Sequence, residues 1–241
     1  MKKTLLTIKS TLKLTDDVFK TILEGDVGTL KAGQFIDIKI EGFTLRRPIS
    51  ICDFDKNSIT IVYKTIGEGT LALSNLPNGQ RLDVLTGLGN GFDSTKIPAN
   101  TKISLVGGGL GVPPLYCLAK HLKGQNINFD VILGFNSDKE IILLNDFNAL
   151  GINTVVTTAD GSYGMKGFVT AVDIKDKYVF ACGPMPMLKA VYKVSNGGQF
   201  SFEARMACGF GVCQGCTIQT TQGFLRVCAD GPVFTKEQII W

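Results

Sequence analysis

Histidine is almost absent from this sequence, since His121 is the only one among 241 residues. It lies in segment 118–122, near the end of an expected helix, where a surface or helix C-terminal position is favoured over catalysis. Imidazole is the commonest acid–base group near neutral pH, so its scarcity excludes most histidine-dependent acid–base and hydrolytic mechanisms. No other side chain has the pattern of a catalytic base, and we expect no catalytic residue of that kind.

Long apolar runs and blocks of like charge are also missing. No run approaches the roughly 20 apolar residues that cross a bilayer, and Lys9, Ser10 and Lys13 interrupt the opening segment before any export signal forms. The net charge of +4 is spread along the chain, without a basic run interleaved with aromatics. We therefore expect a soluble, cytoplasmic protein with no membrane span and no nucleic-acid partner.

Cysteine, in contrast, is well represented and patterned. Four of the seven cysteines form a C-x4-C-x2-C-x11-C motif: Cys208, Cys213, Cys216 and Cys228. This spacing is typical of plant-type ferredoxins, in which four thiolates hold one [2Fe–2S] cluster. The glycines within segment 209–215 allow the tight loop that turns the sulfurs inward. The motif therefore favours one-electron chemistry.

Two other uses of these cysteines remain open. A four-cysteine zinc site is one, although zinc sites usually draw two ligands from each of two separated C-x2-C pairs. Two disulfides are the other, and they would require an oxidising compartment, for which the sequence carries no export signal. The spacing and the glycine content together favour the iron–sulfur cluster.

Residues 1–97 predict a small antiparallel barrel. Strand-like segments alternate with glycine- or asparagine-bearing turns at residues 5–14, 35–40, 59–64 and 81–85. Arg47 and Ser50, on either side of a Pro-Ile pair, can hold an anionic phosphate and the edge of a flavin, and Gly69-Thr70 offers backbone amides to a pyrophosphate. Without further context, Arg47 in a surface ion pair and Gly69 in a simple turn are equally compatible with the sequence.

Residues 98–198 change to strand–helix alternation, which predicts a doubly wound, parallel nucleotide-binding sheet. Strand 103–106 runs into the glycine-rich turn 107–111, although the turn is not the standard G-x-G-x-x-G fingerprint. Further strands are expected at residues 129–134, 153–158 and 178–181. Asp138 could accept a hydrogen bond from a ribose hydroxyl and so favour NAD over NADP, or it could be an exposed helix cap.

The remaining cysteines outside the motif divide into two kinds. Cys52 and Cys117 are expected to be small buried apolar side chains. Cys182 precedes Gly183-Pro184 at a strand end and is compatible with core packing or with a place beside a cofactor. Residues 199–241, which carry the cysteine motif, are too few to build a core unaided and would need the cluster and a neighbouring domain to stay folded.

Four motifs stand in one order along the chain: Arg47-Pro48-Ile49-Ser50, Gly107-Gly108-Gly109-Leu110-Gly111, Ala181-Cys182-Gly183-Pro184 and the cysteine motif. This order resembles the ferredoxin–NAD(P) reductase superfamily. Within it, the chain is most similar to the electron-transfer subunits of NAD-linked, two-subunit dihydroorotate dehydrogenases. The resemblance covers essentially the whole chain.

The resemblance implies three cofactors and a set of residues for each. FAD would be bound by Arg47, Pro48, Ile49, Ser50, Val62, Tyr63, Lys64, Gly69 and Thr70. NAD would be bound by Gly107, Gly108, Gly109, Leu110, Cys182, Gly183 and Pro184. The [2Fe–2S] cluster would be held by Cys208, Cys213, Cys216 and Cys228. The general superfamily motif has a flavin-stacking tyrosine at the position of Ile49. The resemblance implies that isoleucine replaces it in this branch.

The resemblance also implies a function. Electrons would pass from the FMN of a dihydroorotate-oxidising partner subunit through the [2Fe–2S] cluster and FAD to NAD+, in pyrimidine (UMP) biosynthesis. Substrate oxidation would belong to the partner, and the implied assembly is a heterotetramer with two copies of each chain. Segment 209–215 would then lie at or near the subunit interface.

Two other functions remain open. One is the small subunit of a ferredoxin-dependent NADPH oxidoreductase or sulfide dehydrogenase, which has the same architecture. Four cysteines, with none replaced by aspartate, favour the dihydroorotate enzyme over it. The other is a non-catalytic adaptor, redox-sensing or zinc-stabilised, that kept the fold without turnover.

Overall fold

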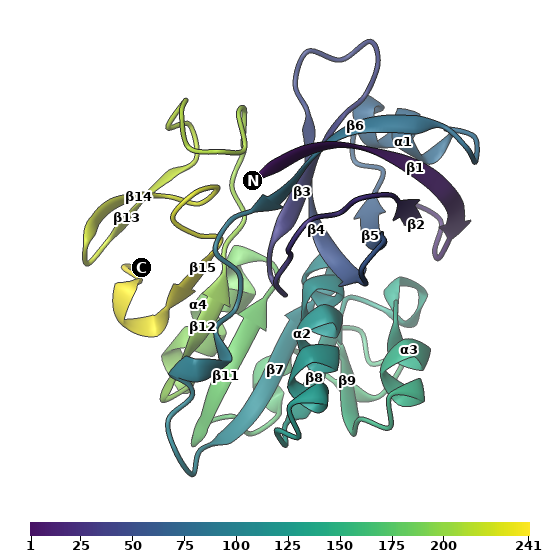
Figure 1. Ribbon diagram of the computed structural model, residues 1–241. Helices are drawn as coiled ribbons and strands as arrows, with labels where there is room; N and C mark the ends of the chain where they lie inside the picture. The colour runs from purple at the N-terminus through teal and green to yellow at the C-terminus, as the bar shows by residue number, and fades with distance from the viewer.

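The computed structural model describes all residues from 1 to 241 and begins with a closed antiparallel barrel (Figure 1). Its strands are β1 (Lys2–Lys13), β2 (Val18–Glu24), β3 (Phe35–Lys39), β4 (Arg47–Phe54), β5 (Ser58–Lys64) and β6 (Arg81–Leu88). They close in the order β1-β2-β5-β4-β3-β6, and helix α1 (Glu68–Ser74) lies between β5 and β6 in the sequence. The predicted barrel is confirmed.

Strand β4 shows why the barrel forms. Ile49 and Ile51 are buried while Pro48 and Ser50, which alternate with them, are exposed, so alternate side chains enter the barrel core. Strands β2 and β4 were not among the strand segments expected from the sequence. Pro48 argues against a strand because it lacks an N–H, yet it is paired with Asp37 of β3.

The second part is a parallel sheet extended by one antiparallel strand. Its strands are β7 (Lys102–Gly108), β8 (Asp130–Phe135), β9 (Thr154–Thr158), β10 (Met165–Lys166), β11 (Lys177–Cys182), β12 (Gly197–Ser201) and β15 (Val233–Thr235). The order is β10-β9-β8-β7-β11-β12-β15, and only β15 runs antiparallel to its neighbour. The parallel nucleotide-binding architecture expected from the sequence is confirmed.

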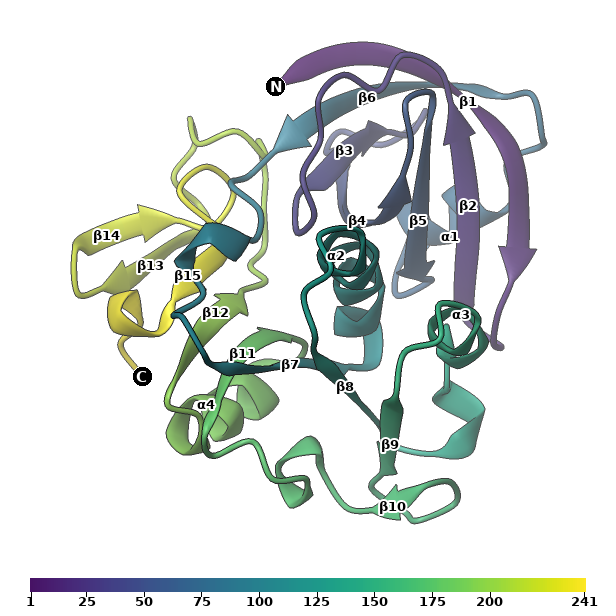
Figure 2. The same cartoon turned by 60° about the horizontal axis from the view of Figure 1, so that its bottom comes forward.

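Helices cover both faces of this sheet. They are α2 (Val112–Gly124), α3 (Leu144–Ala149) and α4 (Met185–Val194). Helices α2 and α3 lie between the sheet and the barrel, and α4 lies on the opposite face (Figure 2). His121 is exposed in the last turn of α2, the surface position expected for it. No helix is long and apolar enough to span a bilayer.

The C-terminal segment forms a small hairpin, β13 (Thr217–Thr220) and β14 (Gly223–Arg226), before β15 joins the sheet. Short 3₁₀ turns complete the secondary structure: η1 (Ser94–Lys96), η2 (Gly109–Gly111), η3 (Asp138–Glu140), η4 (Val169–Ala171) and η5 (Lys236–Gln238). The terminal Trp241 stacks on Phe202, with ring centroids 5.5 Å apart. The segment therefore packs as an extension of the sheet.

Asn90 joins the barrel exit to the C-terminal segment. Its side-chain amide donates to the carbonyls of Asp230 (3.0 Å) and Val233 (2.7 Å), and its side-chain oxygen accepts from the Val233 N–H at 3.1 Å. Its own backbone N–H donates to the carbonyl of Gly231 at 2.7 Å. Asn90 thus holds β15 and the residues just before it next to the end of β6.

We expect Asn90→Ala to lower the free energy of unfolding by about 2 kcal/mol, because three side-chain hydrogen bonds are lost and their partners are left unpaired. Urea denaturation checks this. Asn57→Ala is the matched control, because Asn57 is exposed and only its backbone forms hydrogen bonds. Equal losses in the two variants would contradict the role of Asn90.

Candidate redox and nucleotide-binding sites

Backbone-to-sulfur hydrogen bonds link the four cysteines of the motif in two pairs. The backbone N–H of Cys213 donates to Sγ of Cys208 at 3.5 Å, and that of Cys228 donates to Sγ of Cys216 at 3.4 Å. No group of three metal-binding side chains converges on one point. A [2Fe–2S] cluster has two irons and takes four thiolates. The two pairs fit the two-iron cluster.

The loop from Cys208 to Cys216 contains residues in the left-handed conformation. Gly209 (φ +75°) and Gln214 (φ +57°) both adopt this conformation, which points successive amides toward the sulfurs. Arg226, at the end of β14, holds the loop in place, because its Nη1 donates to the carbonyl of Gly211 at 2.9 Å. Its guanidinium is held in turn by Asp230, with Nε and Oδ2 2.8 Å apart.

The electrostatics of the loop favour a thiolate. Burial acts to raise the pKa of the Cys208 thiol, but backbone N–H donors from Cys213, Phe210 and Val212 outweigh it and lower this pKa to about 6. Burial and the neighbouring Cys216 raise the pKa of Cys228. The thiolate is the form that binds iron, so the loop already stabilises one ligand in its binding state.

The other three cysteines lie in apolar surroundings. Cys52 and Cys117 are buried in the core between β4 and α2, as expected, and burial raises the pKa of both thiols. Cys182 ends β11, and burial raises its pKa to about 12 despite a hydrogen bond with Ser201. These thiols are neutral at physiological pH.

Gly209 is where the cysteine loop touches the barrel. A Cβ on Gly209 would lie 2.7 Å from Oδ2 of Asp37, which is a residue of β3. Asp37 is buried, and its Oδ1 has no hydrogen-bond partner. The loop therefore packs directly on the strand that is paired with Pro48 of β4.

The candidate flavin residues of the barrel come together around Arg47. Its guanidinium lies 4.8 Å from the ring centroid of Phe43, and a Cβ on Gly69 would lie 2.2 Å from its Nε. A side chain at position 69 would therefore displace this guanidinium from the first turn of α1. Arg46 forms the ion pair, with Asp83 at 2.8 Å, whereas Arg47 has no carboxylate within that distance. Nη1 of Arg47 donates to the backbone carbonyl of Leu45, but the guanidinium has no carboxylate partner, and such a group fits a phosphate of FAD.

The other expected flavin residues differ in exposure. Pro48 and Ser50 are exposed on β4. Ile49, Val62 and Tyr63 are buried, so they can present only backbone groups to a ligand. The Tyr63 hydroxyl is 3.2 Å from that of Thr21, inside the barrel. Lys64 pairs with Asp17 at 2.8 Å, and the Thr70 hydroxyl donates to the carbonyl of Gly67 at 3.0 Å.

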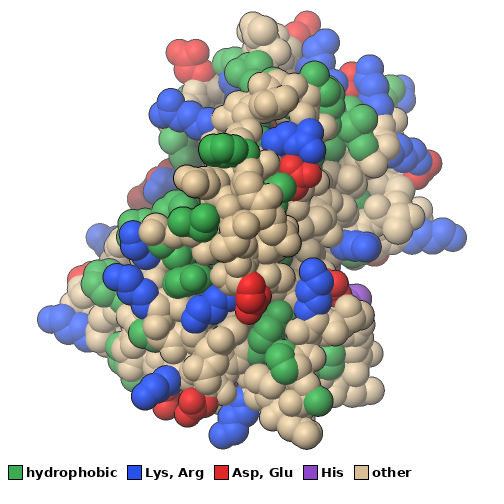
Figure 3. Space-filling view, turned by 90° about the vertical axis from the view of Figure 1, so that its left-hand side faces the viewer, with side chains coloured by type: hydrophobic (Ala, Val, Ile, Leu, Met, Phe, Trp, Pro, Cys, Tyr) green, Lys and Arg blue, Asp and Glu red, His purple; other side chains and the backbone are tan.

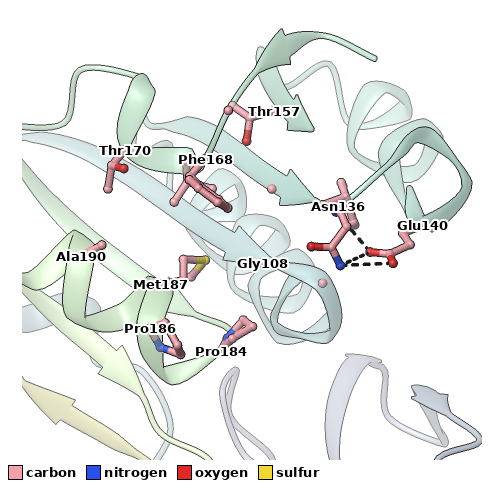
Figure 4. Close-up of a pocket in the computed structure, with 15 residues that line it drawn as sticks. Gly108, Asn136, Glu140, Thr157, Phe168, Thr170, Pro184, Pro186, Met187 and Ala190 are labelled. Carbon is pink, nitrogen blue, oxygen red and sulfur yellow. Dashed lines mark hydrogen bonds between the residues drawn. The ribbon is translucent and has the colours of Figure 1, made fainter. Parts of the chain in front are cut away.

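A cavity of about 460 Å³ opens at the carboxyl ends of β7, β8 and β11 (Figure 4). This is where nucleotides bind in doubly wound sheets. Of the residues expected to bind NAD, Gly108, Gly109 and Pro184 line the cavity. The remaining four are not among its lining residues: Gly107, Leu110, Cys182 and Gly183.

Sequence reasoning missed several side chains of this cavity. They are Asn136, Glu140, Thr157, Phe168 and Met187. Asn136 directly follows β8 and Thr157 lies near the end of β9, so a search of every strand end for polar residues would have found these two. Asp138, the residue considered for a ribose contact, is exposed and does not line the cavity.

The fold and these sites define a class of protein: a reductase module with a flavin-type barrel, a nucleotide-binding sheet and an iron–sulfur segment. Residues 203–240 match the family model of the iron-sulfur cluster binding domain of dihydroorotate dehydrogenase B. The chain is 43% identical to dihydroorotate dehydrogenase B (NAD(+)), electron transfer subunit, of Bacillus pumilus, over 99% of this chain and 98% of the relative. The Fusobacterium nucleatum subunit is 40% identical over 97% and 96%.

The structure is also similar to a solved NADH-dependent reduced ferredoxin–NADP oxidoreductase, with a TM-score of 0.88, 29% identity and coverage of 99% of this chain and 90% of that one. Phthalate dioxygenase reductase shares the fold, with a TM-score of 0.65 and 17% identity over 80% of this chain and 64% of that one. The chain belongs to the family of electron transfer subunits of NAD(+)-dependent dihydroorotate dehydrogenase B.

We expect Gly209→Ala to prevent cluster incorporation while FAD is retained, because the new Cβ would clash with Asp37. Iron, acid-labile sulfide and flavin analysis of the purified protein checks this. Gly223→Ala is the matched control, since Gly223 (φ +98°) has open space around its Cβ position. Both variants carry the left-handed cost of about 1–2 kcal/mol, so iron loss in both would show that the contact with Asp37 is unimportant.

Alkylation should separate the cysteines by pKa and exposure. In iron-depleted protein at pH 8, we expect iodoacetamide to modify Cys208, whose thiol is ionised above a pKa of about 6, and the exposed Cys213. Cys117 and Cys182, with pKa values raised to about 12, should react only after denaturation. Peptide mass spectrometry reads the pattern, and fast modification of Cys182 in the folded protein would contradict it.

Proposed function

We propose that this chain is the electron-transfer subunit of an NAD-linked dihydroorotate dehydrogenase in pyrimidine biosynthesis. The observation that supports it best is the coexistence, in one chain, of the two thiol pairs, the unpaired Arg47 on the barrel and the cavity at the sheet edge. When bound, the [2Fe–2S] cluster passes electrons singly, and FAD exchanges them in pairs with the nicotinamide. The protein contributes binding, orientation and shielding.

The flavin site would use side chains at its exposed positions and backbone elsewhere. Arg47, held against α1 and unpaired, would bind a phosphate of FAD, and Ser50 would contact the ring edge. Ile49, Val62 and Tyr63 are buried and would contribute N–H and C=O groups. Four more residues would complete the site: Pro48, Lys64, Gly69 and Thr70.

The nicotinamide nucleotide would occupy the cavity at the sheet edge. Gly108 and Gly109 follow β7 and would bring backbone amides to its phosphates, and Pro184 would lie near the nicotinamide ring. The cavity lining would be supported by four neighbouring residues that do not line it themselves: Gly107, Leu110, Cys182 and Gly183. No catalytic acid or base is required of this chain, because hydride transfer needs placement and not proton transfer.

The partner would be the FMN-containing subunit that oxidises dihydroorotate, with two copies of each chain in a cytoplasmic complex. The cysteine loop offers a docking point, because Phe210 and Val212 are 44% and 73% exposed. The face that carries this segment shows separate groups of apolar side chains between lysines and arginines (Figure 3). Exposed aromatic side chains such as Phe210 are enriched at protein interfaces.

Three functional regions follow from this proposal: a FAD-binding region at 1–97, an NAD-binding region at 98–198 and a cluster-binding region at 199–241. Strand β12 crosses the last boundary, since it begins at Gly197 and is paired with both β11 and β15. The last two regions would therefore fold as one cooperative unit.

The test begins with anaerobic purification of the chain and its partner. Iron, sulfide and flavin analysis should give one [2Fe–2S] cluster and one FAD per chain. The chain alone should oxidise NADH with an artificial acceptor, and dihydroorotate-dependent reduction of NAD+ should require the FMN subunit. A colourless, zinc-containing chain without NADH oxidation would instead support the adaptor, and a requirement for ferredoxin would support the NADPH oxidoreductase.

Cys213→Ser separates the two redox sites within the chain. We expect it to abolish cluster absorbance and the dihydroorotate-dependent reaction while NADH oxidation by the FAD site remains, because a hydroxyl is a poor substitute for a thiolate ligand. Cys117→Ser, in the core and outside the motif, is the control and should keep both activities. Equal loss of FAD and cluster in Cys213→Ser would contradict separate sites.

A further inference from the structure

Glu140 is the only charged side chain that lines the cavity at the sheet edge, and no lysine or arginine lines it. It lies in η3, the short turn that follows β8. Figure 4 shows Glu140 and Asn136 together at one end of the cavity, with Thr170 and Ala190 at the other. A single carboxylate among otherwise uncharged lining residues is a strong discriminator between ligands of different charge.

Its place in the fold assigns it a part of the nucleotide. A dinucleotide lies across the carboxyl edge of such a sheet, with the pyrophosphate at the first strand and the adenosine ribose beside an acidic residue after the second. Here β7 is the first strand, β8 is the second, and β11 lies on the other side of β7. Pro184, which follows β11, is therefore on the nicotinamide side, and Glu140 is on the adenosine side.

We infer that Glu140 is the residue that selects NAD(H) over NADP(H). Its carboxylate accepts hydrogen bonds from the adenosine ribose hydroxyls and repels a phosphate at the 2′ position. The inference rests on the proposed function, in that the cavity is taken to bind a nicotinamide nucleotide.

Asn136 holds the carboxylate in place for this role. Its backbone N–H and its Nδ2 donate to Oε2 of Glu140 at 3.2 and 2.9 Å, and Nδ2 is also 3.2 Å from Oε1. A carboxylate has about four lone-pair sites, so acceptor capacity remains for ribose hydroxyls. The side chain is half-buried, which strengthens its field in the cavity.

The cations near Glu140 are not placed to bind a 2′-phosphate. Lys139 is exposed and does not line the cavity. Lys64, on β5 of the barrel, is close enough for Glu140 to contribute to raising its pKa, but the first cause of that shift is its hydrogen bond with Asp17. The Lys64 and Asp17 charges are only 2.8 Å apart, so this lysine is already paired.

Glu140→Gln tests the charge without removing the hydrogen-bond acceptor for Asn136. The measurement is calorimetric binding of ADP-ribose and of 2′-phospho-ADP-ribose to the FAD- and cluster-loaded protein. We expect the wild type to prefer ADP-ribose and the variant to lose about tenfold of that preference, with weaker binding of ADP-ribose and tighter binding of the 2′-phosphate. The kcat/KM ratio for NADH over NADPH should fall to the same extent, through KM.

Asp138→Asn is the matched control. Asp138 lies two residues before Glu140, and its side chain is exposed and outside the cavity, so this variant removes the same charge without changing the cavity lining. It should leave the preference unchanged. An unchanged preference in Glu140→Gln, an equal loss of both ligands, or an equal shift in the control would overturn the inference while the proposed function stands. A wild type that binds neither nucleotide would overturn the proposed function as well.

Discussion

The packing of the cysteine-bearing segment against the rest of the chain is the constraint on which this structure depends. The segment cannot supply a core of its own, so β15 pairs with β12 and the cysteines Cys216 and Cys228 share a core with the sheet. Asn90 binds the segment to the end of β6, and Gly209 rests on Asp37 of the barrel. One segment therefore contacts both larger parts, and an electron-transfer chain needs its sites to be held at fixed separations.

The same packing explains how one chain maintains sulfur groups of opposite character. Backbone N–H donors lower the pKa of Cys208 against the effect of burial, whereas burial without such donors raises the pKa of Cys182. The difference lies in the local backbone, since left-handed turns direct amides at one sulfur and a regular strand directs its amides into the sheet. Thiols that ionise easily and thiols that stay neutral thus coexist in one protein without a histidine to distinguish them.

Much of the fold was predictable because its signals are local. The antiparallel barrel, the parallel sheet and the cysteine loop each follow from short-range patterns of apolar residues, glycines and cysteines. Strand β4 could not be predicted from the sequence because Pro48 opposes strand formation locally. Only the pairing of β4 with β3 overrides this effect. The sequence indicates Asp138 and gives no sign of Glu140, because the direction in which a short turn presents each carboxylate depends on contacts such as the hydrogen bond from Asn136 to Glu140.

The sequence by itself determined the kind of chemistry, because the spacing of four cysteines restricts which metal groups they can hold. It also determined the family, which the order of four motifs indicates and which the identity to the relatives confirms. Only the tertiary structure decided which thiols form pairs, that Arg47 and not Arg46 is free of a carboxylate, and that one acidic residue enters the nucleotide cavity. These are properties of distances between residues far apart in sequence, and a linear pattern does not contain them.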